Sequence, residues 1–143
     1  MQNSDQVDTY LMMHQNKFPR TTLTILRAKM LDASDSQWNK VRFSELKEPN
    51  TMLLISLFTG RFGIERFIIK RRVSGILKLL ICLPAIAAGI ACLFLFLMQE
   101  NEYGKLCLFL FLLGEVCWIA DLFLIRRMTR EYNYNQINKL LNE

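Results

Sequence analysis

The sequence has a single histidine, His14, and no cysteine or glutamate stands near it at the spacing of metal ligands. It also has no phosphate-binding glycine loop and no serine or cysteine nucleophile with a plausible base. These absences predict a protein that is not an enzyme and that holds no metal or cofactor. The net charge of +5 gives no reason to expect nucleic acid as a partner. We interpret His14 as an ordinary surface or core residue.

The first 50 residues lack the basic start, the short apolar core and the cleavage site of a secretory signal. We therefore expect this region to stay in the cytoplasm. Its apolar residues recur at helical spacing in three stretches, and Ser34 with Gln37 resembles a capping box at the start of the third. The third helix is expected to continue as far as Leu46. A core of this size is marginal, so the module should dock on another surface.

Two long apolar runs fill the second half of the chain. Residues 79–98 contain no charge, and residues 106–125 are interrupted only by Glu115 and Asp121. About 20 apolar residues cross a hydrocarbon core roughly 30 Å thick, so each run predicts a membrane span. The cysteines all lie in these runs without clustering, and we expect free thiols. They are Cys82, Cys92, Cys107 and Cys117.

A shorter apolar segment with glycine and charge precedes the first run. Residues 51–58 are apolar, and Thr59, Gly60 and Gly63 then interrupt the pattern before residues 64–69. We interpret the segment as a short, broken membrane helix, which requires cover by protein or by a water-filled cavity. The predicted domains are a cytoplasmic helical module, a membrane domain and a polar helical tail, over residues 1–49, 50–128 and 129–143.

Basic residues flank the two runs at their outer ends. They are Lys70, Arg71, Arg72 and Lys78 at the first run, and Arg126, Arg127 and Arg130 at the second. The polar turn expected over residues 99–105 has one lysine. Basic residues favour the cytoplasmic side, so both outer ends are predicted to be cytoplasmic. A re-entrant segment over residues 51–69 satisfies this arrangement, and a third full span is the alternative. The cluster at 70–72 should also contact anionic lipid head groups.

Four motifs are spread through the membrane region. They are Phe58, Gly60 and Gly63; the triplet Glu65-Arg66-Phe67; Gly75, Lys78, Leu79 and Leu80; and Gly114, Trp118 and Asp121. This set resembles the TM2-domain family, including bacterial members with a small N-terminal helical region. The chain departs from the family at Lys70, where glycine is usual, and by an insertion within residues 81–113. The resemblance implies a multi-pass membrane protein, and it does not imply an enzyme.

Five charged residues in or beside the membrane segments are candidate structural or functional residues: Arg61, Glu65, Arg66, Glu115 and Asp121. One interpretation is an i,i+4 pair between Arg61 and Glu65. The other pairs Arg66 with Asp121 or Glu115 on the last span. Glu115 lies about mid-span, where a carboxyl group is protonated, paired across a subunit interface or exposed to a wet lumen. Asp121 could otherwise cap the span near the interface.

The sequence thus predicts an all-α integral membrane protein. Its fold is a helical hairpin, preceded by a short broken or re-entrant helix and an N-terminal helical module. Small residues around Gly89 favour close helix approach and therefore a homo-oligomer. We expect a non-enzymatic scaffold or adaptor in a bacterial inner membrane, with both termini in the cytoplasm. Its expected partners are membrane lipids and a cytoplasmic protein bound by residues 1–49. The alternative is an oligomeric pore or channel in which Glu115 and Arg66 face water.

Overall fold

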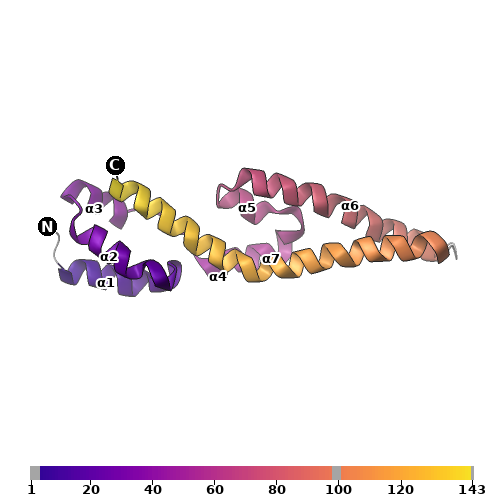
Figure 1. Ribbon diagram of the computed structural model, residues 1–143, viewed down its shortest axis with the longest axis horizontal. Helices are drawn as coiled ribbons and strands as arrows, with labels where there is room; N and C mark the ends of the chain where they lie inside the picture. Colours follow the sequence, from indigo (N-terminus) through magenta and orange to yellow (C-terminus); the bar gives the residue numbers. More distant parts are fainter. Residues whose placement is uncertain (1–3, 98–100, 143) are drawn as a thin grey trace. The chain divides into compact units, whose positions relative to one another are not determined.

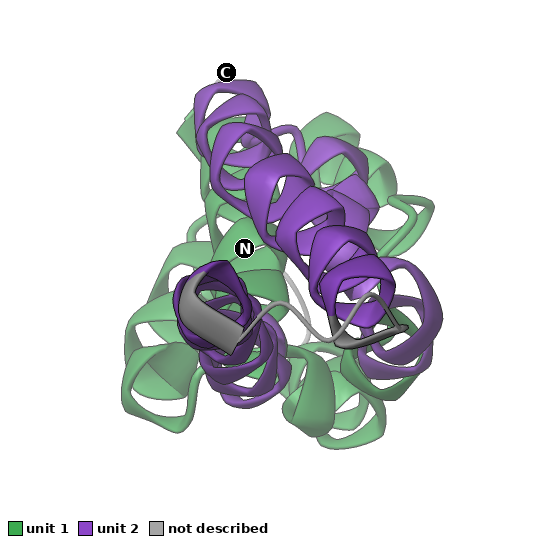
Figure 2. Ribbon diagram, turned by 90° about the vertical axis from the view of Figure 1, so that its right-hand side faces the viewer, with its two compact units in different colours: residues 1–52, 126–143 green, residues 53–125 purple. Residues whose placement is uncertain are grey.

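The computed structural model describes residues 4–97 and 101–142, which are mostly helical and include no strand (Figure 1). The chain divides into two compact units (Figure 2). Unit 1 combines residues 1–52 with 126–143, and unit 2 is residues 53–125. Helices α4 (Pro49–Thr59) and α7 (Asn101–Asn142) each contribute residues to both units. The all-α fold class is confirmed.

Unit 1 contains the three helices predicted near the N-terminus. They are α1 (Ser4–His14), α2 (Leu23–Leu31) and α3 (Asp35–Arg42), with short 3-10 turns η1 (Gln15–Lys17) and η2 (Arg20–Thr22) between α1 and α2. The predicted capping box is confirmed, because Ser34 Oγ accepts from the Gln37 amide and Gln37 Oε1 accepts from the Ser34 amide. The predicted extent of the third helix was wrong. It ends at Arg42, where Ser44 bonds back to the Val41 carbonyl, and Leu46 packs on the core from outside the helix.

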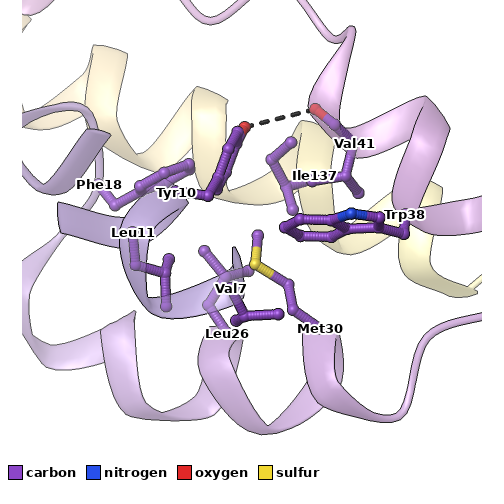
Figure 3. Packing of buried hydrophobic residues seen from close by; sticks show 9 residues of the cluster. All are labelled: Val7, Tyr10, Leu11, Phe18, Leu26, Met30, Trp38, Val41 and Ile137. Carbon is purple, nitrogen blue, oxygen red and sulfur yellow. Dashed lines mark hydrogen bonds between the residues drawn. The ribbon is translucent and has the colours of Figure 1, made fainter. Parts of the chain in front are cut away.

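The core of unit 1 is completed by the C-terminal part of α7. Ile137 is fully buried among eight apolar residues of the N-terminal region, as Figure 3 shows. Within this core the Tyr10 hydroxyl donates to the Val41 carbonyl at 3.3 Å. Asn133, also fully buried, donates to the carbonyls of Lys17 (3.0 Å) and Lys47 (2.8 Å) and accepts from the Lys47 amide. Residues from both ends of the chain therefore form one hydrophobic core.

Unit 2 begins with a broken helix, as predicted. Helix α4 ends at Thr59, the 3-10 turn η3 covers Gly60–Phe62, and α5 runs from Ile64 to Ile68. Gly63 lies between η3 and α5 with a φ of 70°, a left-handed conformation that glycine adopts without steric cost. A side chain at this position would also lie 3.3 Å from the Gly75 carbonyl oxygen. Glycine is therefore required at the break by both conformation and space.

Helices α6 (Arg72–Leu97) and α7 form an antiparallel hairpin in unit 2 (Figure 1). Gly89 faces Phe111, Ala85 faces Gly114, and Lys78 reaches Asp121, so contacts move down α6 as they move up α7. The small residues Gly89 and Ala85 thus permit close packing within the chain. Of the turn expected over residues 99–105, positions 101–105 are helical, and 98–100 lie outside the described residues.

Both long helices are apolar enough to cross a membrane. The candidate spans are Arg72–Leu95 and Tyr103–Asn142, and their most apolar windows are only 22% and 11% buried within the protein. A core helix of a soluble protein would bury most of such a window. Exposed leucine, isoleucine and phenylalanine side chains cover both helices, as lipid contact requires.

Candidate functional site: an ion-pair cluster in the membrane unit

Helix α5 is held against the start of α6 by close packing. The ring of Phe67 on α5 would lie 2.9 Å from a Cβ at Gly75, so only glycine lets the two helices approach this closely. Helix α5 is five residues long and ends where the Arg71 amide bonds to the Arg66 carbonyl and the Lys70 amide to that of Phe67. This is a Schellman end, and Lys70 occupies its left-handed position with a φ of 58°.

Four charged side chains converge where α5, α6 and α7 meet. The Lys78 ammonium group on α6 lies 2.6 Å from Glu65 Oε1 and 2.6 Å from Asp121 Oδ2. Arg66 pairs with the other Asp121 oxygen and also donates to Ser74 at the start of α6. We call Glu65, Arg66, Lys78 and Asp121 the four-charge cluster. It contains two cations and two carboxylates, so its net charge is zero.

The four-charge cluster is almost entirely enclosed by the protein. The side chains of Glu65 and Lys78 are 1% and 5% exposed, and those of Asp121 and Arg66 are 10% and 16% exposed. Burial removes water that would otherwise solvate these charges, so each depends on its partner. Such a cluster is better suited to specifying one helix arrangement than to raising stability, and loss of one member leaves a costly unpaired charge.

A second ion pair joins the break to α7 at Glu115. Arg61 Nη2 lies 2.7 Å from Glu115 Oε1, and its guanidinium group stands 5.4 Å from the centre of the Trp118 ring. Trp118 in turn donates from Nε1 to the Ser56 carbonyl at 3.3 Å. This pair is more open than the four-charge cluster, because the Arg61 and Glu115 side chains are 45% and 24% exposed.

Residues 45–99 match the family model of the TM2 domain. The chain contains a TM2 domain. No curated protein and no solved structure gives a match. The matched residues include the break, α5 and the whole of α6, with Lys78. Gly114, Trp118 and Asp121 lie beyond them, yet the structure brings all three against the TM2 domain. With the two long exposed apolar helices, this match identifies a membrane protein.

Each of the five charged candidate residues has an ion-pair partner in the structure. Arg66 pairs with Asp121, which confirms the predicted link between the triplet and the last motif. The alternative Arg61–Glu65 pair is wrong, because the break at Gly63 interrupts the helical spacing on which it depends. Arg61 bonds to Glu115, and Glu65 bonds to Lys78. Asp121 binds two cations, so it does not simply cap a helix near the interface.

Lys78 is the residue of the TM2 domain that sequence reasoning missed as a site member. From the sequence, Lys78 is used only to predict topology, although a lysine one turn inside an apolar span also indicates an acidic partner. Its position three residues after Gly75 brings it to the face of α6 that meets α5. The other basic residues predicted near this end, Lys70, Arg71 and Arg72, are exposed.

Proposed function

We propose that this TM2-domain protein is a non-enzymatic, homo-oligomeric membrane scaffold or adaptor. The observation that carries the proposal is the neutral, enclosed four-charge cluster. Its charges bind one another and connect three helices, as expected of a structural element. An ion path would instead need charges that remain accessible to water along its length.

The proposal places both termini in the cytoplasm of a bacterial inner membrane, with two spans and one re-entrant segment. Residues 52 and 126 belong to one compact unit, which cannot be divided by a bilayer. Because α6 and α7 are antiparallel, Arg72 lies on the same side as residue 126. Residues 53–71 would then leave and return on one side. The basic residues at that side favour the cytoplasm.

Cysteine labelling tests this arrangement. A cysteine at Asn101 should react with a membrane-impermeant maleimide from the periplasm, and cysteines at Ser36 and Asn142 only from the cytoplasm. The unaltered chain, whose four cysteines lie in the spans, measures background labelling. Periplasmic labelling at Ser36 would indicate three full spans, and labelling of Asn101 and Asn142 from one side would refute the hairpin topology.

The proposal includes two kinds of partner. Anionic lipid head groups would contact the exposed cluster at Lys70, Arg71 and Arg72, each worth about 1 kcal/mol near a charged surface. A cytoplasmic protein would bind residues 1–49, where Met12, Met13 and Phe43 are 73%, 75% and 80% exposed. Exposed side chains of this size favour a protein interface over a purely solvated surface.

One observation favours a pore as the second candidate function. The Arg61–Glu115 pair is partly open, so water could reach it. Planar-bilayer recordings and membrane-potential measurements on expressing cells distinguish the two functions. A scaffold gives flat recordings and an intact potential. A pore depolarises the cells, and Glu115→Gln then changes its conductance or ion preference.

A further inference from the structure

The Arg61–Glu115 pair lies about midway along the apolar part of the hairpin. On α7, Glu115 stands about halfway between Tyr103 and Arg126. Gly114 beside it faces Ala85, which is about halfway along α6. The pair is therefore as far from either membrane surface as the hairpin allows.

This pair is incompletely covered by its own chain. Arg61 donates from Nη2 to the Glu115 carboxylate. Among the residues that the structure describes, Glu115 is the one hydrogen-bond acceptor of Arg61. A guanidinium group has five N–H donors. Charged side chains at this depth face protein or water, because acyl chains offer them no hydrogen bonds. The open side of the pair therefore requires a polar surface.

The pair borders the contact between α6 and α7. A small hollow there is lined by Arg61 and Glu115 together with residues that pack within the chain, among them Ala85, Phe111 and Gly114. What this face offers to another chain is therefore the ion pair itself, whose Arg61 and Glu115 side chains are 45% and 24% exposed.

We propose that the face carrying Arg61 and Glu115 is where two copies of this chain meet in the membrane. This proposal rests on the homo-oligomeric scaffold proposed above and names its interface. A second copy inserted in the same orientation carries its own pair at the same depth. It also offers both signs of charge, so Arg61 of each copy can donate to Glu115 of the other. No other kind of partner is bound to carry both signs of charge at this depth.

Charge reversal gives the sharpest test. Two differently tagged full-length chains carry Arg61→Glu and Glu115→Arg respectively, so one has two acids at the face and the other has two bases. Each alone should associate at least about tenfold more weakly than the unaltered chain, and the mixture should recover association. Co-purification from nanodiscs measures this. Equal association of each variant alone and of the mixture overturns the proposal.

A second experiment does not depend on charged variants. Ile119 lies one turn from Glu115 on the same face of α7, and Leu113 lies on the opposite face. Ile119→Cys is the test variant, and Leu113→Cys is the matched control. Their side chains are 48% and 49% exposed. Oxidation in the membrane should cross-link chains through Ile119→Cys and not through Leu113→Cys.

Cross-linking through Leu113→Cys alone overturns this interface but preserves the oligomer, whereas monomers throughout overturn the oligomeric scaffold as well. Rapid reaction of Ile119→Cys with a water-soluble maleimide overturns the proposal in favour of a wet lumen.

Discussion

Lys78 and Glu65 lie 13 residues apart in sequence, yet their charged atoms are 2.6 Å apart and almost completely buried. The turn at Lys70 makes this contact possible, because it folds α5 back against the first turns of α6. The same ammonium group also binds Asp121, so Lys78 joins all three helices of the cluster, as Arg66 does through Ser74 and Asp121.

Replacing Lys78 by methionine should destabilise unit 2 by about 3–5 kcal/mol, since Glu65 loses its cation and Asp121 loses one of two. Unfolding by SDS in mixed micelles measures the change. Lys105→Met, at an exposed position near the start of α7, is the matched control and should cost less than about 0.5 kcal/mol. Equal effects of the two substitutions would show that the enclosed lysine has no special role.

The Arg66–Asp121 pair should show strong coupling in a double-mutant cycle. Arg66→Ala alone should cost several kcal/mol, because Asp121 keeps only Lys78. Adding Asp121→Asn should restore part of that loss and give a coupling free energy of about 0.5–3 kcal/mol. The same cycle with Glu115→Gln should be additive, since Glu115 binds Arg61. Additivity in the Asp121 cycle would contradict the pairing.

Alanine substitutions at two glycines of α7 separate packing from helix propensity. At Gly114 a Cβ would lie 2.5 Å from that of Ala85, whereas at Gly104 nothing lies within 4 Å. Gly114→Ala should therefore destabilise the hairpin by about 1–3 kcal/mol. Gly104→Ala should stabilise it by about 0.5–1 kcal/mol. Thermal unfolding in detergent measures both, and a neutral Gly114→Ala would mean that the helices lie further apart.

Lys70 offers a stabilising substitution. Its left-handed φ of 58° is unfavourable for a side chain and ordinary for glycine. Lys70→Gly should therefore raise the free energy of unfolding by about 1 kcal/mol. The control is Arg72→Gly, which stands at the first residue of α6 and should lower stability. If Lys70→Gly is destabilising, the lysine side chain contributes more to the fold than its conformation costs.

In unit 1, Asp8 should titrate below an ordinary aspartate. Arg27 donates hydrogen bonds to both of its carboxylate oxygens, at 2.5 and 2.8 Å, and this lowers the pKa of Asp8. A lowered folded-state pKa gives stability that is present above about pH 4 and lost as the pH falls through the folded value. Carboxyl chemical shifts of the full chain in micelles measure the pKa of Asp8. The Arg27→Gln variant should return it toward the ordinary value.

Much of this fold was predictable because its signals are local. Helical spacing, the Ser34 capping box and the glycines of the break each depend on residues close in sequence. The Arg66–Asp121 pair was also predicted, since two motifs with opposite charges had to meet in an apolar region. The pairs of Arg61 and Lys78 were not predicted. The pair of Lys78 depends on how α5 folds back on α6 at Lys70, and the pair of Arg61 depends on where the break places η3 against α7, so both are set by packing between helices.

The contribution of α7 to unit 1 was harder to foresee. Ile137, Leu140 and Leu141 form one apolar stripe at helical spacing in the tail, but a stripe does not identify the surface that it meets. The burial of Asn133 could not be predicted, because an asparagine that bonds to distant backbone groups resembles any surface asparagine in sequence.

The burial of Ile137 in the core of unit 1 has a consequence for the order of events during synthesis. Helices α1 to α3 leave the ribosome first, but their core is incomplete until α7 has been translated. At about 5–20 residues per second, the intervening chain takes several seconds to make. Both membrane spans are produced within that interval. The N-terminal helices must therefore wait, partly folded and exposing apolar side chains, while the hairpin enters the bilayer. We expect chaperones to bind nascent chains at this stage and to release them once Ile137 has emerged.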